Sequence, residues 1–177
     1  MPVKNFSSIG GYAVDATEVM DTDRALKNIS AMHMVSNHFV DANKDIFILK
    51  RQTDAVNNTQ QLSLDGTTPL AGNTPQLAND TVSFASATVF GQETTTNIYV
   101  YAAKFDLVIT TTAGGVPTVA SERKIIVRNN PPGQETWNVV PFPLQIGAAP
   151  FFTFQVSSVT TSSTVKWIGN LELTVVS

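Results

Sequence analysis

The sequence contains no cysteine and few charged residues. Only 14% of its 177 residues are Asp, Glu, Lys or Arg, against roughly 25% in ordinary soluble domains. The lack of cysteine excludes disulfides, thiolate nucleophiles, cysteine-ligated zinc and iron–sulfur clusters. A net charge of −3 argues against a general surface for nucleic acid or anionic membrane. We therefore expect neither nucleic acid nor a membrane among the partners.

Hydrophobic and hydroxyl-bearing residues make up much of the chain. Hydrophobic residues account for 42%, and Ser and Thr together number 35, about a fifth of the sequence. This composition excludes a disordered chain, a coiled coil and a transmembrane protein, and it suits one compact domain with an N-terminal appendage. Lys4 precedes an apolar stretch that Ser and Gly interrupt, which is a poor secretory signal. We expect no signal peptide and synthesis in a cytosol.

The charges are spread unevenly and suggest two differently built parts. Residues 1–54 hold 13 of the 25 charged side chains, although they are less than a third of the chain. The sequence predicts an N-terminal arm, a helix and a first strand over 1–54, a polar loop over 55–80, and an antiparallel β-sandwich body over 81–177. We expect residues 1–54 to pack on that body as one domain.

The N-terminal part contains a helix pattern followed by a strand pattern. Between Thr22 and Phe39, apolar residues recur at spacings of three and four, which predicts an amphipathic helix. The members of this stripe are Leu26, Ile29, Met32, Val35 and Phe39. Asp21 and Asp23 supply a cap and negative charge at its start. The run 46–50 begins with four consecutive apolar residues, which would lie on both faces of a strand. This pattern predicts a strand buried on both faces.

Residues 52–80 are irregular. They are rich in Asn and Gln, and Gly66, Pro69, Gly72 and Pro75 are turn formers. A short strand at 62–64 interrupts what is otherwise a long loop. Long loops in compact domains are commonly functional or ordered by a partner, and we expect this one to reach a neighbouring molecule.

From Thr81 onward the pattern is one strand after another. The predicted runs are 82–90, 99–109, 119–128, 137–146, 151–159 and 165–176. In the last run Trp167 and Leu171 share one parity, and Lys166 and Glu172 share the other. Threonine-rich strands with turn signals between them predict a mainly β fold, an antiparallel β-sandwich of jelly-roll-like type.

The low charge bears on the edges of these sheets. A β-branched hydroxyl side chain suits a half-buried strand face, so threonine replaces lysine and glutamate there without loss of strand propensity. Isolated β domains usually guard their edge strands with Lys, Glu or Pro, and such residues are few here. We therefore expect edges that are left open for neighbours.

The candidate metal ligands do not form a site. The segment 41–45 opens like a calcium loop, but Ile46 stands where glycine is needed and Gln52 where a bidentate glutamate is needed. His33 and His38 would lie about 140° apart on the predicted helix and cannot share one ion. The sequence predicts no metal and no cofactor, with His33 partly buried and the 41–45 segment a polar connection.

No catalytic motif is present. There is no GxSxG elbow, no Walker A string and no GxGxxG. Four carboxylates from different predicted strands are compatible with a glycosidase pair, although acids scattered over a sheet are also expected without any function. They are Asp106, Glu122, Glu135 and Glu172. We expect a protein that is not an enzyme.

Two further groups allow two interpretations each. Four aromatic residues suit either a sugar-stacking platform or the core: Tyr99, Tyr101, Trp137 and Trp167. The Val, Leu and Ile neighbours of both tryptophans favour the core. The basic residues at 123–124 and 128 suit either a phosphate contact or a solvated or interface strand. The acidic chain as a whole favours the strand.

Several segments together resemble a known class of protein. The stretch Ala13–Glu18, the apolar stripe of 26–39, the run 46–51 and the threonine-rich strands after it are similar in style to small virion structural proteins of tailed bacteriophages. This resemblance implies a β-sandwich subunit of the virion that packs with copies of itself or on another virion protein. It carries over no functional residue.

The leading hypothesis is a non-enzymatic virion component: a capsid, head-decoration or cement subunit, or a neck or tail piece. Its partners would be its own copies, as a homo-oligomer, and other virion proteins, with residues 1–16 ordered only by a neighbour. The alternative is a carbohydrate-binding β-sandwich or receptor-binding module. Solvent exposure of Trp137 or Trp167 distinguishes the two hypotheses.

Overall fold

The computed structural model describes residues 12–14, 17–20, 30–35, 42–159 and 163–176. The chain divides into two compact units, 1–30 and 31–177. In the first unit, β1 (Tyr12–Val14) and β2 (Thr17–Met20) pair as an antiparallel hairpin. The second unit contains the remaining strands, which form two sheets.

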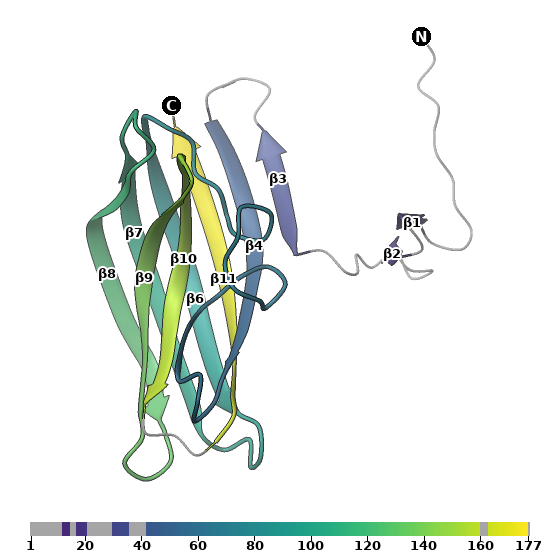
Figure 1. Cartoon of the computed structure of the whole chain (residues 1–177), viewed down its shortest axis with the longest axis vertical. Coiled ribbons are helices and arrows are strands. Elements are labelled where there is room, and N and C mark those ends of the chain that lie inside the picture. Colours follow the sequence, from purple (N-terminus) through teal and green to yellow (C-terminus); the bar gives the residue numbers. More distant parts are fainter. Residues whose placement is uncertain (1–11, 15–16, 21–29, 36–41, 160–162, 177) are drawn as a thin grey trace. The chain divides into compact units, whose positions relative to one another are not determined.

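The larger sheet of the second unit has six antiparallel strands in the order β3-β4-β11-β6-β7-β8. Figure 1 shows β11 inserted between β4 and β6, so the last strand of the chain joins its early and middle strands. The strand bounds are β3 (Ala31–Val35), β4 (Ala42–Thr53), β6 (Thr81–Glu93), β7 (Val100–Thr111), β8 (Pro117–Asn130) and β11 (Val165–Val176).

A smaller sheet faces the larger one. It consists of β5 (Thr59–Gln61), β10 (Ala149–Val159) and β9 (Thr136–Ile146), in that order and also antiparallel. The prediction of a mainly antiparallel β body is confirmed. The six predicted runs after Thr81 coincide with β6 to β11 within a few residues, and burial alternates with period two in β6, β7 and β11.

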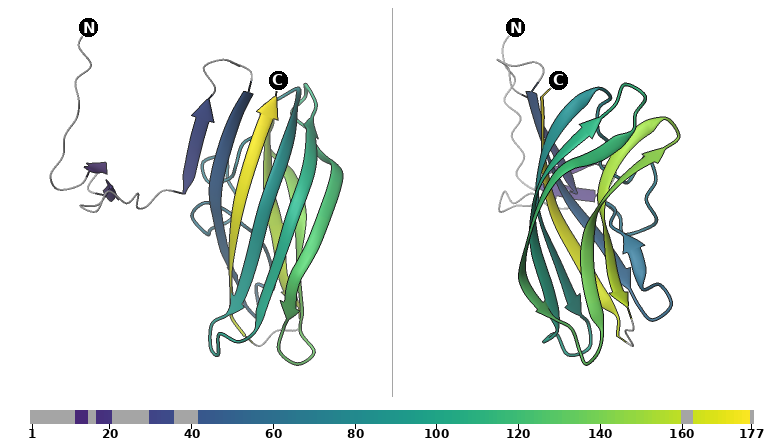
Figure 2. Two further views of the ribbon diagram at one scale, coloured as in Figure 1. Left: turned by 180° about the vertical axis from the view of Figure 1, so that it is seen from behind. Right: turned by 90° about the vertical axis from the view of Figure 1, so that its left-hand side faces the viewer.

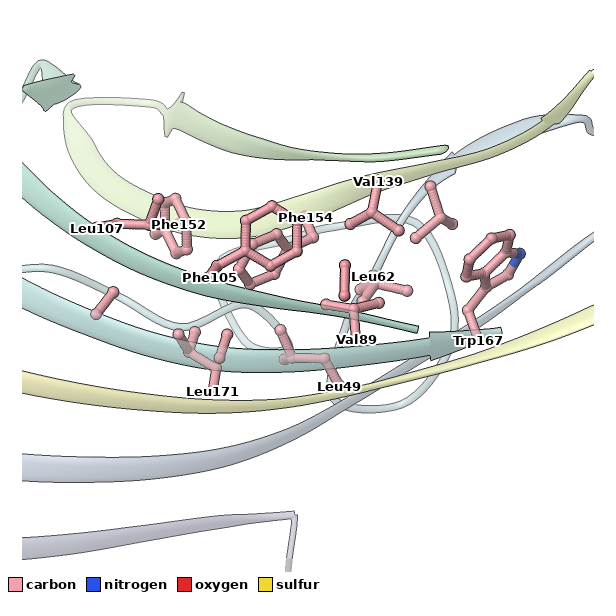
Figure 3. Packing of buried hydrophobic residues seen from close by; sticks show 14 of the residues in the cluster. Leu49, Leu62, Val89, Phe105, Leu107, Val139, Phe152, Phe154, Trp167 and Leu171 are labelled. Carbon is pink, nitrogen blue, oxygen red and sulfur yellow. The ribbon is translucent and has the colours of Figure 1, made fainter. Parts of the chain in front are cut away.

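The core fills the space between the two sheets. Phe105 of β7 packs on Phe154 of β10 with ring centroids 4.9 Å apart, and Phe152 meets Phe154 edge-on at 5.2 Å. Figure 3 shows these rings directed toward one another from opposite sheets, with Leu49, Leu62 and Val89 beside them. Burial of these large side chains supplies most of the stabilisation.

A second cluster centres on Trp167 at one end of the core. Its ring lies 5.9 Å from those of both Tyr101 and Trp137. Its indole N–H donates to Thr53 Oγ1 at 2.9 Å, and Ser158 Oγ is bonded to the same oxygen at 2.7 Å. Strands β4, β10 and β11 therefore meet in one buried hydrogen-bonded group that links the two sheets.

The helix predicted over 22–39 is wrong at its centre. Residues 31–35 form the edge strand β3, which pairs with β4 from Ala31↔Phe47 to Val35↔Asn43. Residues 22–29 and 36–39 lie outside the described part of the chain. Four of the five residues in 31–35 are apolar and they occupy both strand faces, so the run also suits a strand, and pairing with the edge of β4 prevailed over the helical spacing.

The strand predicted at 46–50 is confirmed but buried on only one face. Within β4, Leu49 is fully buried against the core, whereas Ile48 on the other face is 44% exposed. The expectation of burial on both faces is therefore wrong. The larger sheet has an inner face toward the core and an outer face, and the outer face carries apolar residues of its own.

Much of the predicted loop folds onto the body of the same molecule. Strand β5 pairs with β10, the Leu62 N–H donates to Phe154 O at 2.9 Å, and Lys50 and Ser63 bond to each other across a β-bridge. Asp65 accepts hydrogen bonds from the backbone N–H of Thr67 and from Asn73 Nδ2. These bonds hold the pKa of Asp65 well below its usual range.

Candidate interaction surface

The outer face of the six-stranded sheet is an exposed surface that carries large apolar side chains. Phe84 and Phe90 of β6 are 49% and 38% exposed there, and Ile48 of β4 and Ile168 of β11 lie on the same face. Figure 2, left, views this sheet from behind, and no other described strand of the Ala31–Ser177 unit packs on it. Contiguous apolar residues left in water mark interaction sites.

Small side chains on the inner side of β6 explain why its large ones face outward. The inward residues of this strand are Ser83, Ala85, Ala87, Val89 and Gly91, all buried. The neighbouring strands bring Trp167 and Phe105 over them, so the space is already occupied. The alternation of the pleat then places Phe84 and Phe90 on the opposite face.

Polar side chains lie between the apolar ones on the outer face. Lys44 Nζ is 2.6 Å from Glu172 Oε1, with both side chains about two-fifths exposed. Ser86 Oγ donates to Asp106 Oδ1 at 3.4 Å. A shallow hollow in the middle of the face is lined by Ile46, Ser86, Thr88, Asn170 and Glu172. Exposed ion pairs of this type contribute little to stability, so this chemistry is available to a partner.

Strand β8 forms one edge of the large sheet, and it is not an open edge. Its pairing with β7 is irregular at two places, between Ala102/Ala103 and between Val108/Ile109, and such bulges discourage further strand pairing. Ile126 and Val127 are exposed beside Arg128. The predicted basic cluster of residues 123, 124 and 128 lies on this strand, as expected for a solvated or interface strand.

Lys124 of β8 links the large sheet to β9 of the small sheet. Its Nζ donates to Val139 O at 2.6 Å and to Asn138 Oδ1 at 2.7 Å, both on β9. The ammonium also lies 5.6 Å from the centroid of Phe105 and 6.0 Å from that of Tyr101. Burial among these groups lowers the pKa of Lys124. One residue of the basic cluster therefore has a structural role.

The β9 edge of the small sheet is guarded as well. Pro141 and Pro143 lie within β9 opposite Phe154 and Phe152 of β10, and proline in a strand is confined to edges because it lacks an N–H to donate. The expectation of unguarded edges is therefore wrong for β8 and β9. The exposed apolar chemistry lies on a sheet face instead.

The aromatic platform is excluded for both tryptophans. Trp137 is 3% exposed and Trp167 is 1% exposed, and Tyr101 is fully buried beside them. Burial raises the pKa of Tyr101. The core interpretation of the tryptophans is confirmed, and the carbohydrate hypothesis loses the stacking surface on which it depended.

The four candidate carboxylates have different surroundings. Asp106 and Glu172 lie on the outer face, aligned with Ser86 between them. Glu122 lies on the exposed edge strand β8, and Glu135 accepts a hydrogen bond from the indole N–H of Trp137 at 2.9 Å. The structure thus brings two of the four together, on an open face.

The metal-like segment is part of a strand. Ala42–Asp45 begins β4, so the predicted polar connection is wrong for these residues, and Asp41 lies outside the described chain. Asp45 Oδ1 is bonded to His33 Nδ1 across the β3–β4 pair. His33 is exposed rather than partly buried, and His38 lies outside the described residues. Within the described ranges, no three His, Cys, Asp or Glu side chains gather as metal ligands.

Comparisons with known proteins give few matches. No family model matches the chain, and no curated protein matches it. Among solved structures, the tailspike protein of Acinetobacter baumannii phage AM24 is similar over 73% of this chain and 26% of that one, with 15% identity and a TM-score of 0.30. The matched region is about a quarter of that tailspike, and likeness at this level assigns neither family nor activity. None of the described residues forms a helix long and apolar enough to cross a bilayer.

Proposed function

We propose that this protein is a non-enzymatic structural subunit of a bacteriophage particle, which assembles through the outer face of its six-stranded sheet. The resemblance of the sequence to small virion proteins of tailed bacteriophages supplies the class of particle. The observation that carries the proposal is the exposure of Phe84 and Phe90 on a sandwich whose core is already filled by other aromatic rings. Burial of such a face in a partner removes the apolar surface from water.

The location of this surface favours assembly by face over assembly by edge. Bulges interrupt β8, prolines lie in β9, and both features oppose strand addition. Threonine, serine and asparagine between the apolar residues supply hydrogen bonds to a neighbour without the desolvation cost of charges. The chain would act as a capsid, decoration, neck or tail component, with other virion proteins or its own copies as partners.

The proposal is tested on the full chain and on the particle. In particles purified from the virus that encodes the chain, quantitative mass spectrometry should find many copies per particle. Light scattering after size exclusion should give a mass above that of the 19.0 kDa monomer that rises with concentration. A chain that is absent from particles and monomeric at high concentration would contradict the proposal.

A further inference from the structure

A single line of paired residues crosses the large sheet and divides its outer face into two halves. Phe47 of β4 is aligned with Leu171 of β11, Leu171 with Ala87 of β6, and Ala87 with Phe105 of β7. We call these four residues the central row. Their side chains belong to the inner face, so the outer-face residues lie immediately on either side of the row.

Most outer-face residues on the two sides of the central row match in chemical type, except on β11, where Glu172 corresponds to Asn170. One side carries Ile46, Glu172, Ser86 and Asp106 across the four strands, and the other carries Ile48, Asn170, Thr88 and Lys104. One step farther out on β6, Phe84 lies on the first side and Phe90 on the second. An isoleucine thus corresponds to an isoleucine, a hydroxyl to a hydroxyl, a phenylalanine to a phenylalanine, and an acid to a base.

We infer that two copies of this chain pair outer face to outer face, about a twofold axis that runs along the central row. Rotation about this axis exchanges the two sides, so Phe84 of one copy meets Phe90 of the other, twice in the interface. Asp106 meets Lys104 in the same way. A twofold interface requires a surface that complements itself, and the pattern about the central row has that property. This inference rests on the proposed function as an assembling subunit.

The acid–base correspondence sets the register of the pair. Asp106 and Lys104 flank Phe105 on the outer side of β7, so the rotation creates two equivalent Asp106–Lys104 contacts. Opposite charges across an interface favour one register and disfavour others. Lys166 lies five residues from the row on β11, where water solvates the rim of an interface. Lys44 and Lys50 lie three residues from the row on opposite sides of it, both on β4, so the rotation also brings these two lysines together, and Lys44 is bonded to Glu172.

The dimensions of the face suit a stable pair. Four strands of about twelve residues cover roughly 40 Å by 19 Å, or about 800 Å² per copy, at ~3.4 Å per residue and ~4.8 Å per strand. A standard specific interface buries about 800 Å² per partner. Sheets that pack face to face lie about 10 Å apart and within about 30° of alignment, which keeps the central strands of the two copies opposite each other.

The register is tested by exchanging the two charges. Asp106→Lys places lysine against Lys104 of the other copy, and Lys104→Asp places aspartate against Asp106. Each single variant should weaken pairing at least tenfold, measured by sedimentation equilibrium. The double variant, with both substitutions, restores two acid–base contacts and should return to within about threefold of the unchanged chain. Lys166→Asp, at the rim of the same face, serves as the control and should change pairing less than either single variant.

Cross-linking tests the direction of the pair, because the chain has no cysteine of its own. Val82 and Gln92 lie at equal sequence distances from Ala87 on opposite sides of the row. They are about 34 Å apart within one strand, yet they face each other across the proposed axis. A mixture of Val82→Cys and Gln92→Cys chains should join 82 to 92 with a bismaleimide of about 10 Å, and neither variant alone should join to itself. Circular dichroism confirms that both fold.

The outcomes separate this inference from the proposed function. If the chain is multimeric but the charge variants pair as tightly as the unchanged chain, or if 82 joins to 82, the twofold face-to-face pair is overturned and assembly by another surface stands. If the unchanged chain is monomeric at high concentration, the pair is overturned as well. The proposed function fails with it only if the chain is also absent from particles.

Discussion

Gly91 of β6 is paired with Trp167 of β11, and it lies against the face of the Trp167 indole. A Cβ built at Gly91 would be 2.5 Å from Cε3 and 2.5 Å from Cζ3 of that ring. The indole is also held by contact with Trp137 and by the hydrogen bond to Thr53. The core therefore depends on a residue without a side chain at this position, and the ring occupies the volume that a side chain would fill.

The substitution Gly91→Ala should lower the free energy of unfolding by about 1–3 kcal/mol, the range for overpacking of a well-packed core. Urea denaturation followed by tryptophan fluorescence measures this loss. Gly72→Ala is the matched control, because a Cβ there meets nothing within 4 Å. Equal stabilities of the two variants would show that the indole moves aside freely.

Removal of the buried hydroxyl at Thr53 should also destabilise the protein. Thr53→Val keeps the shape but leaves the indole N–H of Trp167 and the hydroxyl of Ser158 without their shared partner. A buried donor without an acceptor costs about 1–3 kcal/mol. Thr53→Ser retains the hydroxyl and should lose less in the same denaturation experiment. A larger loss for serine than for valine would contradict the role assigned to the hydrogen bonds.

Stability should fall in acid through Glu93, which closes the turn after β6. Its carboxylate accepts hydrogen bonds from the backbone N–H of Thr96 and of Thr95, which lower its pKa from 4.5 to about 2. A depressed pKa in the folded state adds stability that is present above pH 4.5 and is lost as the pH falls toward 2.

The measurement is the midpoint of thermal unfolding between pH 7 and pH 2. Glu93→Gln should lower the midpoint at pH 7 and give a shallower decline between pH 4.5 and 2, since glutamine does not titrate. Acid curves for Glu93→Gln and the unchanged chain that run parallel would contradict the assignment.

Lys124 should hold the edge strands β8 and β9 together. Lys124→Met keeps an unbranched apolar stem over Phe105 but removes the bonds to Val139 O and Asn138. Amide hydrogen exchange in β8 and β9 should become faster, with little change in β4 or β11, because local opening follows the loss of local bonds. Lys166→Met, on the exposed outer face of β11, should leave all four strands unchanged.

The sequence alone was sufficient for the strands after Thr81, because their hydrophobicity alternates with period two over long stretches. The inward parity of β7 and β11, which includes Tyr101, Phe105, Trp167 and Leu171, is correct for this reason. It also favoured the core for both tryptophans. The helix predicted over 22–39 failed at 31–35, where the run is too short and too evenly apolar for its period to decide, and the choice depends on the β4 edge beside it.

The candidate surface was beyond the reach of sequence reasoning. In β6 the parity with two phenylalanines, Phe84 and Phe90, faces outward, and the parity with Gly91 and the alanines is buried. A local pattern gives the two faces of a strand but not the volume available to each. A signal was present in the unusually small residues that alternate with the phenylalanines, but it has meaning only beside the large rings of the neighbouring strands.

Local chemistry thus determined that this chain forms antiparallel β-strands, without cysteine or a recognisable catalytic motif. Only the tertiary structure decided which face of β6 is buried, which edges are guarded, and where apolar surface remains in water. Period-two patterning is a property of consecutive residues, whereas packing is a property of residues far apart in the chain. The indole of Trp167 occupies the space over Gly91, and the phenylalanines of β6 consequently face outward.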